Sequence, residues 1–186
     1  RTDAYGGSAE NNMRFPNMVV DRVRSAIGPD KLISYRISQD GVDDFTGFWQ
    51  AGQEYVEAIG KALKDMDADV IHWSSFDWKT NRFDAAQPPI PVTLKKISGK
   101  PFITNGNVFD GETAEEVFAQ NAGDVVAIGR PIFAHPDWPY IVASGMDYDW
   151  MDFDRKYVIH PPYDYTYAYP ASLPERDWSP EAKVKR

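Results

Sequence analysis

Two glycines, each followed by a polar residue, stand where successive predicted strands end. Gly106 and Asn107 close the stretch ITNGN, and Gly129 and Arg130 close the stretch AIGR. Glycine lets the backbone approach a ligand closely with its N–H groups exposed, and a neighbouring arginine can bind a phosphate in bidentate fashion. Either motif alone is also explained by a tight turn with a surface arginine, but the pair on successive strands favours a phosphate site.

The elements that position these motifs alternate between helix and strand. Apolar residues at helical spacing predict helices over residues 9–26, 52–66, 92–97 and 114–121, with one or two further turns over 138–144. Runs rich in β-branched and aromatic residues predict strands over residues 31–38, 68–75, 100–107 and 124–133. This alternation predicts an α/β fold with a parallel sheet, whose carboxyl strand ends meet at one edge.

Composition excludes several classes of function. The chain has 186 residues, no cysteine and a formal net charge of −8. An acidic surface repels phosphates, which argues against a nucleic-acid or membrane-surface partner. The absence of cysteine excludes disulfides, thiolate zinc sites and iron–sulfur clusters from this chain, and no metal site is expected. No apolar run is long enough to span a bilayer, and we expect a cytoplasmic protein.

The last part of the chain differs in composition from the rest. Residues 146–186 are rich in tyrosine, aspartate and proline and show no clear period. We expect residues 1–145 to form the α/β domain and residues 146–186 to form an irregular aromatic tail that packs on it. The alternative is a tail that covers the active site.

Three segments resemble one enzyme family. The run RTDAYGGSAENNMRF at residues 1–15 resembles the signature of the Old Yellow Enzyme family, the FMN-dependent ene-reductases also called NADH:flavin oxidoreductases. The segments ITNGNVFDGETAEE and VVAIGRPIFAHPDWP resemble that family's segments at barrel strands seven and eight. The resemblance covers roughly residues 1–139. It implies a (β/α)8 TIM barrel with FMN at the carboxyl ends of its strands and NAD(P)H as the reductant.

The resemblance also implies roles for five residues. Arg36, which ends the stretch ISYR, matches the arginine that lies against the flavin ring in this family. A cation there stabilises the anionic reduced flavin. Gly106, Asn107, Gly129 and Arg130 match the residues that contact the FMN phosphate.

The family's proton-transfer residues have no counterpart in the chain. In this family a His–Asn or His–His pair polarises the substrate carbonyl and a tyrosine donates the proton, and both lie on the strand before the RTD run. The resemblance therefore implies strands five to eight, the C-terminal half of the barrel, with no catalytic residue of its own. Unpaired strand edges would then require a complementary N-terminal half or self-association. Such a chain is expected to be inactive alone.

Two other features of the predicted second strand invite a functional interpretation. His72 could replace the missing histidine, but a histidine on a strand is more often packed and hydrogen-bonded than catalytic. The region from Trp73 to Trp78 could contact a substrate, because loops after barrel strands face the active site, and simple packing explains it equally well.

Together these observations predict the FMN-binding portion of an NAD(P)H-dependent oxidoreductase that reduces small activated alkenes, either enones or enoates. One alternative is a half barrel that binds a phosphate-bearing ligand or only dimerises, without turnover. Another is a different phosphate-binding barrel enzyme, such as a relative of dihydrouridine synthase or IMP dehydrogenase.

Overall fold

The computed structural model describes residues 1–39, 49, 52–134 and 138–145, and it divides the chain into two compact units. The first unit consists of Arg1–Val108 and Thr113–Ala127, and the second of Phe109–Glu112 and Ile128–Arg186. The predicted aromatic tail over 146–186 lies outside the described residues.

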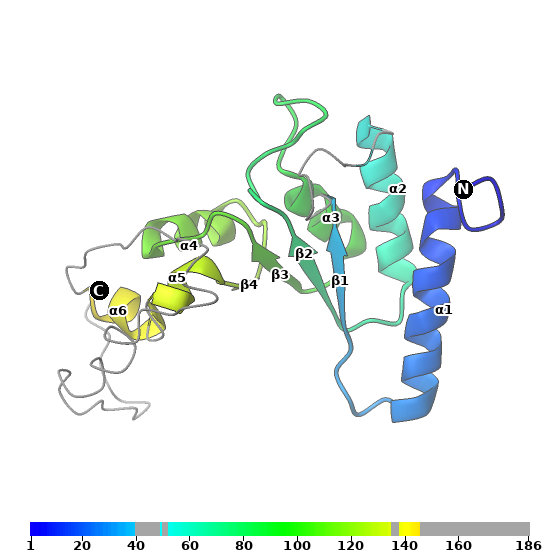
Figure 1. The fold of residues 1–186 in the computed structure, drawn as a ribbon, viewed down its shortest axis with the longest axis horizontal. Coiled ribbons are helices and arrows are strands. Elements are labelled where there is room, and N and C mark those ends of the chain that lie inside the picture. Colours follow the sequence, from blue (N-terminus) through cyan, green and yellow to red (C-terminus); the bar gives the residue numbers. More distant parts are fainter. Residues whose placement is uncertain (40–48, 50–51, 135–137, 146–186) are drawn as a thin grey trace. The chain divides into compact units, whose positions relative to one another are not determined.

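The first unit contains a parallel sheet, as the alternation of elements predicts (Figure 1). Its strands follow one another across the sheet in the order β1-β2-β3-β4 and run over Ser34–Ser38, Val70–Ser74, Phe102–Asn105 and Val125–Val126. Within the described part of the chain β1 and β4 each pair with one neighbour, so each has one unpaired edge. Such a row of unpaired N–H and C=O groups favours pairing with another strand.

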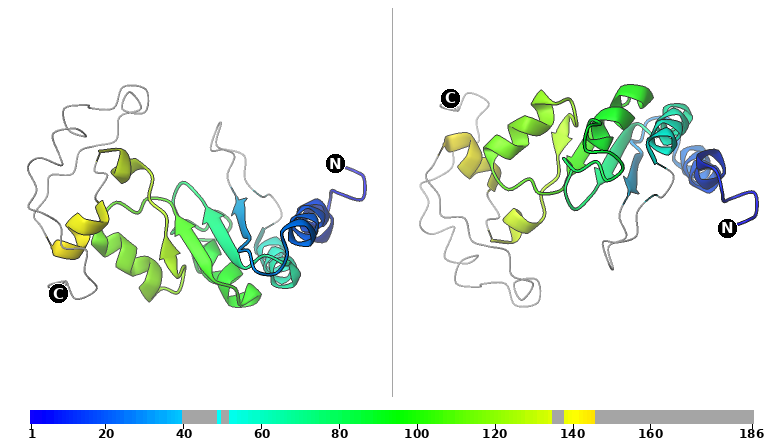
Figure 2. Two further views of the ribbon diagram at one scale, coloured as in Figure 1. Left: turned by 90° about the horizontal axis from the view of Figure 1, so that it is seen from below. Right: turned by 90° about the horizontal axis from the view of Figure 1, so that it is seen from above.

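Helices connect the strands. α1 (Ala9–Ile27) precedes β1, and the crossovers that follow are α2 (Gly52–Asp65), α3 (Ile90–Ser98) and α4 (Gly111–Ala119). α2 and α3 cover one face of the sheet (Figure 2). Ile71, Trp73 and Phe102 are almost fully buried in the core that includes these helices.

The opposite face of the sheet is polar at its carboxyl end. Because side chains alternate along a strand, Arg36, His72, Ser74 and Asn105 share the face away from the helices. Arg36 is exposed and the other three are partly buried. We call this surface, formed by Arg36, His72, Ser74 and Asn105, the open face.

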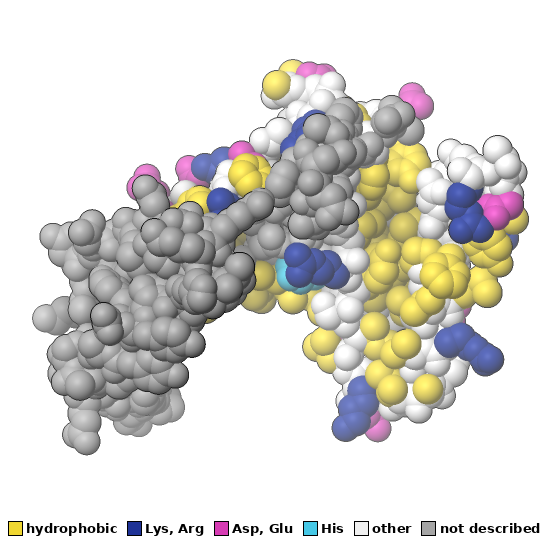
Figure 3. Space-filling model, in the orientation of Figure 1, with side chains coloured by type: hydrophobic (Ala, Val, Ile, Leu, Met, Phe, Trp, Pro, Cys, Tyr) yellow, Lys and Arg dark blue, Asp and Glu magenta, His cyan; other side chains and the backbone are white. Residues whose placement is uncertain are grey.

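α1 leaves an apolar stripe exposed to solvent. Ser8 caps its start, because the Ser8 Oγ accepts a hydrogen bond from the Asn11 N–H at 3.1 Å, and the helix continues through Pro16 without dividing there. Figure 3 shows hydrophobic side chains gathered over α1 and α2. The stripe consists of large apolar side chains that are 39–62% exposed: Phe15, Met18, Val19, Val23 and Ile27.

Among the described residues, none of the helices combines the length and hydrophobicity needed to cross a bilayer.

The predicted strand over 124–133 is wrong in its second half. Only Val125 and Val126 form a strand, and α5 (Arg130–Ala134) follows as a short helix. The helical turns predicted over 138–144 are confirmed as α6 (Trp138–Ser144). Pro131 has no N–H to donate to a sheet, and proline fits the first turn of a helix. The Ile132 N–H instead donates to the Gly129 carbonyl at 3.1 Å.

Candidate active site

Arg36 lies on the open face at the middle of β1. Its Nη2 donates a hydrogen bond of 2.6 Å to the Ser74 Oγ on the neighbouring strand β2. The strand register places Arg36 beside His72. The predicted flavin-contacting arginine is therefore a cation held at a fixed place on the face that the helices do not cover.

His72 is packed and hydrogen-bonded, as predicted. Its Nε2 lies 3.0 Å from the Asn105 Oδ1, while the Asn105 Nδ2 donates to the Ser75 carbonyl at 3.4 Å. Because an amide oxygen only accepts, the His72 Nε2 carries the proton and donates. Burial lowers the pKa of His72; the bond to Asn105 opposes this, and the positive charge of Arg36 adds to the lowering. The imidazole is consequently neutral at pH near 7.

Gly106 follows β3 in a conformation that other residues rarely adopt. Its φ is 120°, and a Cβ built there would lie 2.7 Å from the Ser75 carbonyl oxygen and 3.0 Å from the Trp78 nitrogen. The close approach that glycine permits is therefore made to the loop after β2. Asn107, the next residue, also has a positive φ of 52°. The phosphate role of both residues stays a prediction.

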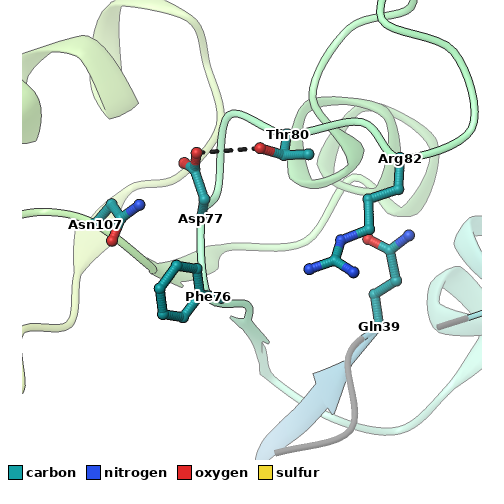
Figure 4. Close-up of a pocket in the computed structure, with 6 residues that line it drawn as sticks. All are labelled: Gln39, Phe76, Asp77, Thr80, Arg82 and Asn107. Atoms are coloured by element: carbon teal, nitrogen blue, oxygen red, sulfur yellow. Dashed lines mark hydrogen bonds between the residues drawn. The ribbon is translucent and has the colours of Figure 1, made fainter. Parts of the chain in front are cut away.

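A small pocket lies at the carboxyl ends of β1, β2 and β3 (Figure 4). Its volume is about 210 Å³, and it is lined by Gln39, Phe76, Asp77, Thr80, Arg82 and Asn107. Asn107 is the predicted site residue in this set. Gln39 and Arg82 were not predicted from the sequence. The position of Gln39 directly after a strand was a usable signal, because strand ends carry the sites of such folds.

Tryptophans of the predicted substrate region are buried. Trp73 is 1% exposed and Trp78 is 0% exposed, so the structure supports the packing interpretation for both. Phe76 lies between them in the sequence, is 48% exposed and lines the pocket. Phe76 is therefore the aromatic side chain of this region that a ligand can reach.

Gly129 and Arg130 belong to the second unit. A Cβ at Gly129 would meet no heavy atom within 4 Å, so the space beside its backbone is open. The Arg130 guanidinium lies 4.6 Å from the centre of the Phe109 ring, and burial lowers the pKa of Arg130. Their joint grip on a phosphate with Gly106 and Asn107 stays a prediction.

A parallel α/β unit with a pocket at its carboxyl strand ends is the arrangement in which barrel enzymes place their active sites, and comparison with known families identifies the family. The model of the NADH:flavin oxidoreductase / NADH oxidase family matches residues 1–149. The chain therefore belongs to this family, which confirms the Old Yellow Enzyme assignment made from the sequence.

Curated relatives support the same family. The NADH oxidase of Thermoanaerobacter brockii is 33% identical over 153 residues, which cover 78% of this chain and 23% of the relative. The cinnamate reductase of Clostridium sporogenes is 29% identical over 158 residues, which cover 75% of this chain and 24% of the relative. The chain thus spans about a quarter of the length of these two relatives.

Solved structures agree on the fold. Morphinone reductase matches with a TM-score of 0.64 and 28% identity, over 84% of this chain and 40% of its own. The Old Yellow Enzyme homologue of Zymomonas mobilis matches with a TM-score of 0.64 and 24% identity, over 84% of this chain and 45% of its own. These neighbours are TIM barrels.

Proteins of this family use FMN, with NAD(P)H as the reductant. The residues of this chain fit that cofactor on two observations. Arg36 presents a guanidinium on the open face, where an anionic ring would be stabilised. The backbone at Gly129 faces open space, since a Cβ there would meet no heavy atom within 4 Å, and Arg130 follows it directly in the sequence. A dianionic phosphate suits such a combination.

Proposed function

We propose that this chain is the FMN-binding C-terminal half of the barrel of an NAD(P)H-dependent oxidoreductase that reduces activated alkenes. The observation that carries the proposal is the cation of Arg36 on the open face, held by Ser74 beside a neutral His72. Relatives named cinnamate reductase and 12-oxophytodienoate reductase support reduction of a small unsaturated molecule.

Each proposed site residue has a distinct task. Bound FMN supplies the hydride chemistry, from NAD(P)H to the alkene. Arg36 would hold the flavin ring and stabilise negative charge that develops on it, and Ser74 keeps the guanidinium oriented. A neutral His72 adds no second positive charge beside Arg36. Gly106 and Asn107, together with Gly129 and Arg130, would hold the phosphate.

The rest of the barrel would supply what this chain does not. The proposal places strands five to eight in this chain, so the substrate-polarising pair and the proton-donating tyrosine would come from the other half. Two features support such a partner: the edge of β1, which is unpaired among the described residues, and the exposed apolar stripe of α1. A partner that covered them would satisfy free backbone groups and remove apolar surface from water.

Reconstitution tests this function. The chain would be produced with and without an N-terminal half barrel and then purified in the presence of FMN. The expected result is a yellow protein that oxidises NAD(P)H with an enone or enoate only when both halves are present. A pair that assembles but binds no FMN, or an assembled flavoprotein that reduces neither class of alkene, contradicts the proposal.

The exposed stripe of α1 also favours a second candidate, a half barrel that only self-associates or binds a phosphate-bearing ligand. The two candidates differ in turnover. NADPH oxidation and association state would be measured for the chain alone with added FMN and for the reconstituted pair. A stable oligomer of the chain alone, together with no turnover in either sample, supports this second candidate.

A further inference from the structure

The pocket beside β1 contains a buried donor, the Gln39 side-chain amide, that finds no partner in the described part of the chain. Gln39 is 5% exposed, and its Nε2 has no hydrogen-bond partner among the residues that the structure describes. Burying an amide N–H₂ group without an acceptor is unfavourable, and a ligand oxygen removes that cost. Gln39 lines the pocket, so an acceptor placed in the pocket could receive this hydrogen bond.

The polar groups of the pocket divide by charge. Figure 4 shows the side chains of Gln39 and Arg82 beside each other, with Asp77 and Thr80 forming a separate hydrogen-bonded pair. The Asp77 oxygens accept hydrogen bonds of 3.1 Å from the Lys79 N–H and the Thr80 hydroxyl, so this carboxylate stabilises its own turn. The Gln39–Arg82 end of the pocket offers an amide N–H₂ group and a guanidinium as donors, and these two groups suit an anionic oxygen.

The size of the pocket limits what it can hold. Its volume of about 210 Å³ is below the range of roughly 300–1,000 Å³ that is usual for complete small-molecule sites. The pocket therefore fits the end group of a ligand. Phe76, half exposed at the same pocket, offers an apolar surface to the carbon atoms that adjoin this end group.

We propose that this pocket binds the carboxylate of an α,β-unsaturated acid, with the Gln39 Nε2 and the Arg82 guanidinium donating to its oxygens and Phe76 contacting the adjoining carbons. The inference rests on the proposed ene-reductase function and deepens that function, because a carboxylate site favours enoates over neutral enones as the substrate class.

Kinetics with a matched pair of substrates test whether the site prefers an unsaturated acid to its neutral ester. The complete flavoprotein that contains this chain would be assayed with cinnamate and with its neutral methyl ester. Arg82→Met and Gln39→Glu should each lower kcat/KM for cinnamate by about 10- to 100-fold and leave the ester nearly unchanged. Lys61→Met, which removes an exposed cation from α2, is the matched control and should affect neither substrate.

Binding of the saturated acid supplies a readout that needs no turnover. The dissociation constant of hydrocinnamate would be measured by calorimetry, and Arg82→Met and Gln39→Glu should raise it about 10-fold or more while Lys61→Met does not. Flavin absorbance and a thermal melt of each variant verify that the fold and the cofactor are retained.

The outcomes separate the two proposals. If no alkene is reduced but hydrocinnamate binding depends on Arg82 and Gln39, the proposed function fails and the carboxylate site stands. If alkenes are reduced but the variants lower the acid and the ester equally, or lower neither, the carboxylate site is overturned. Failure of the wild-type protein to bind hydrocinnamate also overturns it.

Discussion

The Arg36 guanidinium and the Ser74 hydroxyl are joined by a hydrogen bond of 2.6 Å between the adjacent parallel strands β1 and β2. A charged donor makes this bond stronger than one between neutral groups. Both residues belong to strands rather than loops, and sites held on regular elements are the more precisely positioned. The bond therefore fixes the Arg36 guanidinium against the sheet.

Removing that cation should weaken FMN binding. Arg36→Met deletes a charged donor and should raise the dissociation constant of FMN by about 10- to 100-fold in the assembled protein. Ser74→Ala removes only the neutral partner and should raise it less. Quenching of FMN fluorescence measures the dissociation constant of each variant, with Lys61→Met as the control. Equal FMN affinity in Arg36→Met and Lys61→Met would remove Arg36 from the flavin site.

His72 should make the chain less stable in mild acid. Burial lowers the pKa of His72 in the folded state, so the unfolded state binds more protons between the two pKa values. The free energy of unfolding should therefore fall as the pH is lowered below about 6.5, the ordinary histidine value. Urea unfolding between about pH 7.5 and 5 should show a smaller fall for His72→Gln than for the wild type. Identical pH profiles would contradict a partly buried, neutral imidazole.

Gly106 should tolerate no side chain. Gly106→Ala combines a positive φ with a contact of 2.7 Å to a backbone oxygen, and such strain costs of order 1–3 kcal/mol or more. The matched control is Gly99→Ala, because Gly99 also has a positive φ, of 67°, but a Cβ there meets no atom within 4 Å. The urea concentration at the midpoint of unfolding should fall further for Gly106→Ala than for Gly99→Ala. Equal losses would show that φ alone accounts for the effect.

Much of the fold follows from local patterns. The apolar period of α2, with Val56, Ile59 and Leu63 all buried, predicts a helix against the sheet, and the alternation of strand and helix predicts the parallel order. The exception is α5. Its residues follow a β-branched run without a break in hydrophobicity, so the proline at 131 was the remaining local signal for the change from strand to helix.

The site was less predictable because its members meet through loops. Arg36 is recognisable because it ends the stretch ISYR, which matches a family motif, although the strand continues to Ser38. Gln39 and Arg82 are 43 positions apart in the sequence, and the structure brings them to one pocket through the irregular chain between β2 and α3. Gly106 was predicted to admit a ligand, yet the contact that the structure shows is with the Ser75 backbone, which depends on the path of the same segment.

The apolar stripe of α1 should control association. Val19→Gln with Val23→Gln replaces two exposed valines on this stripe, so the free energy of unfolding of the chain should change by no more than about 0.5 kcal/mol per site. If a complementary half barrel or a second copy buries the stripe, the dissociation constant should rise about tenfold or more, since burying one valine contributes roughly 1.5 kcal/mol or more. Sedimentation equilibrium measures it. Ser25→Gln is the control on the same helix, and an equal effect of Ser25→Gln would exclude the stripe from the interface.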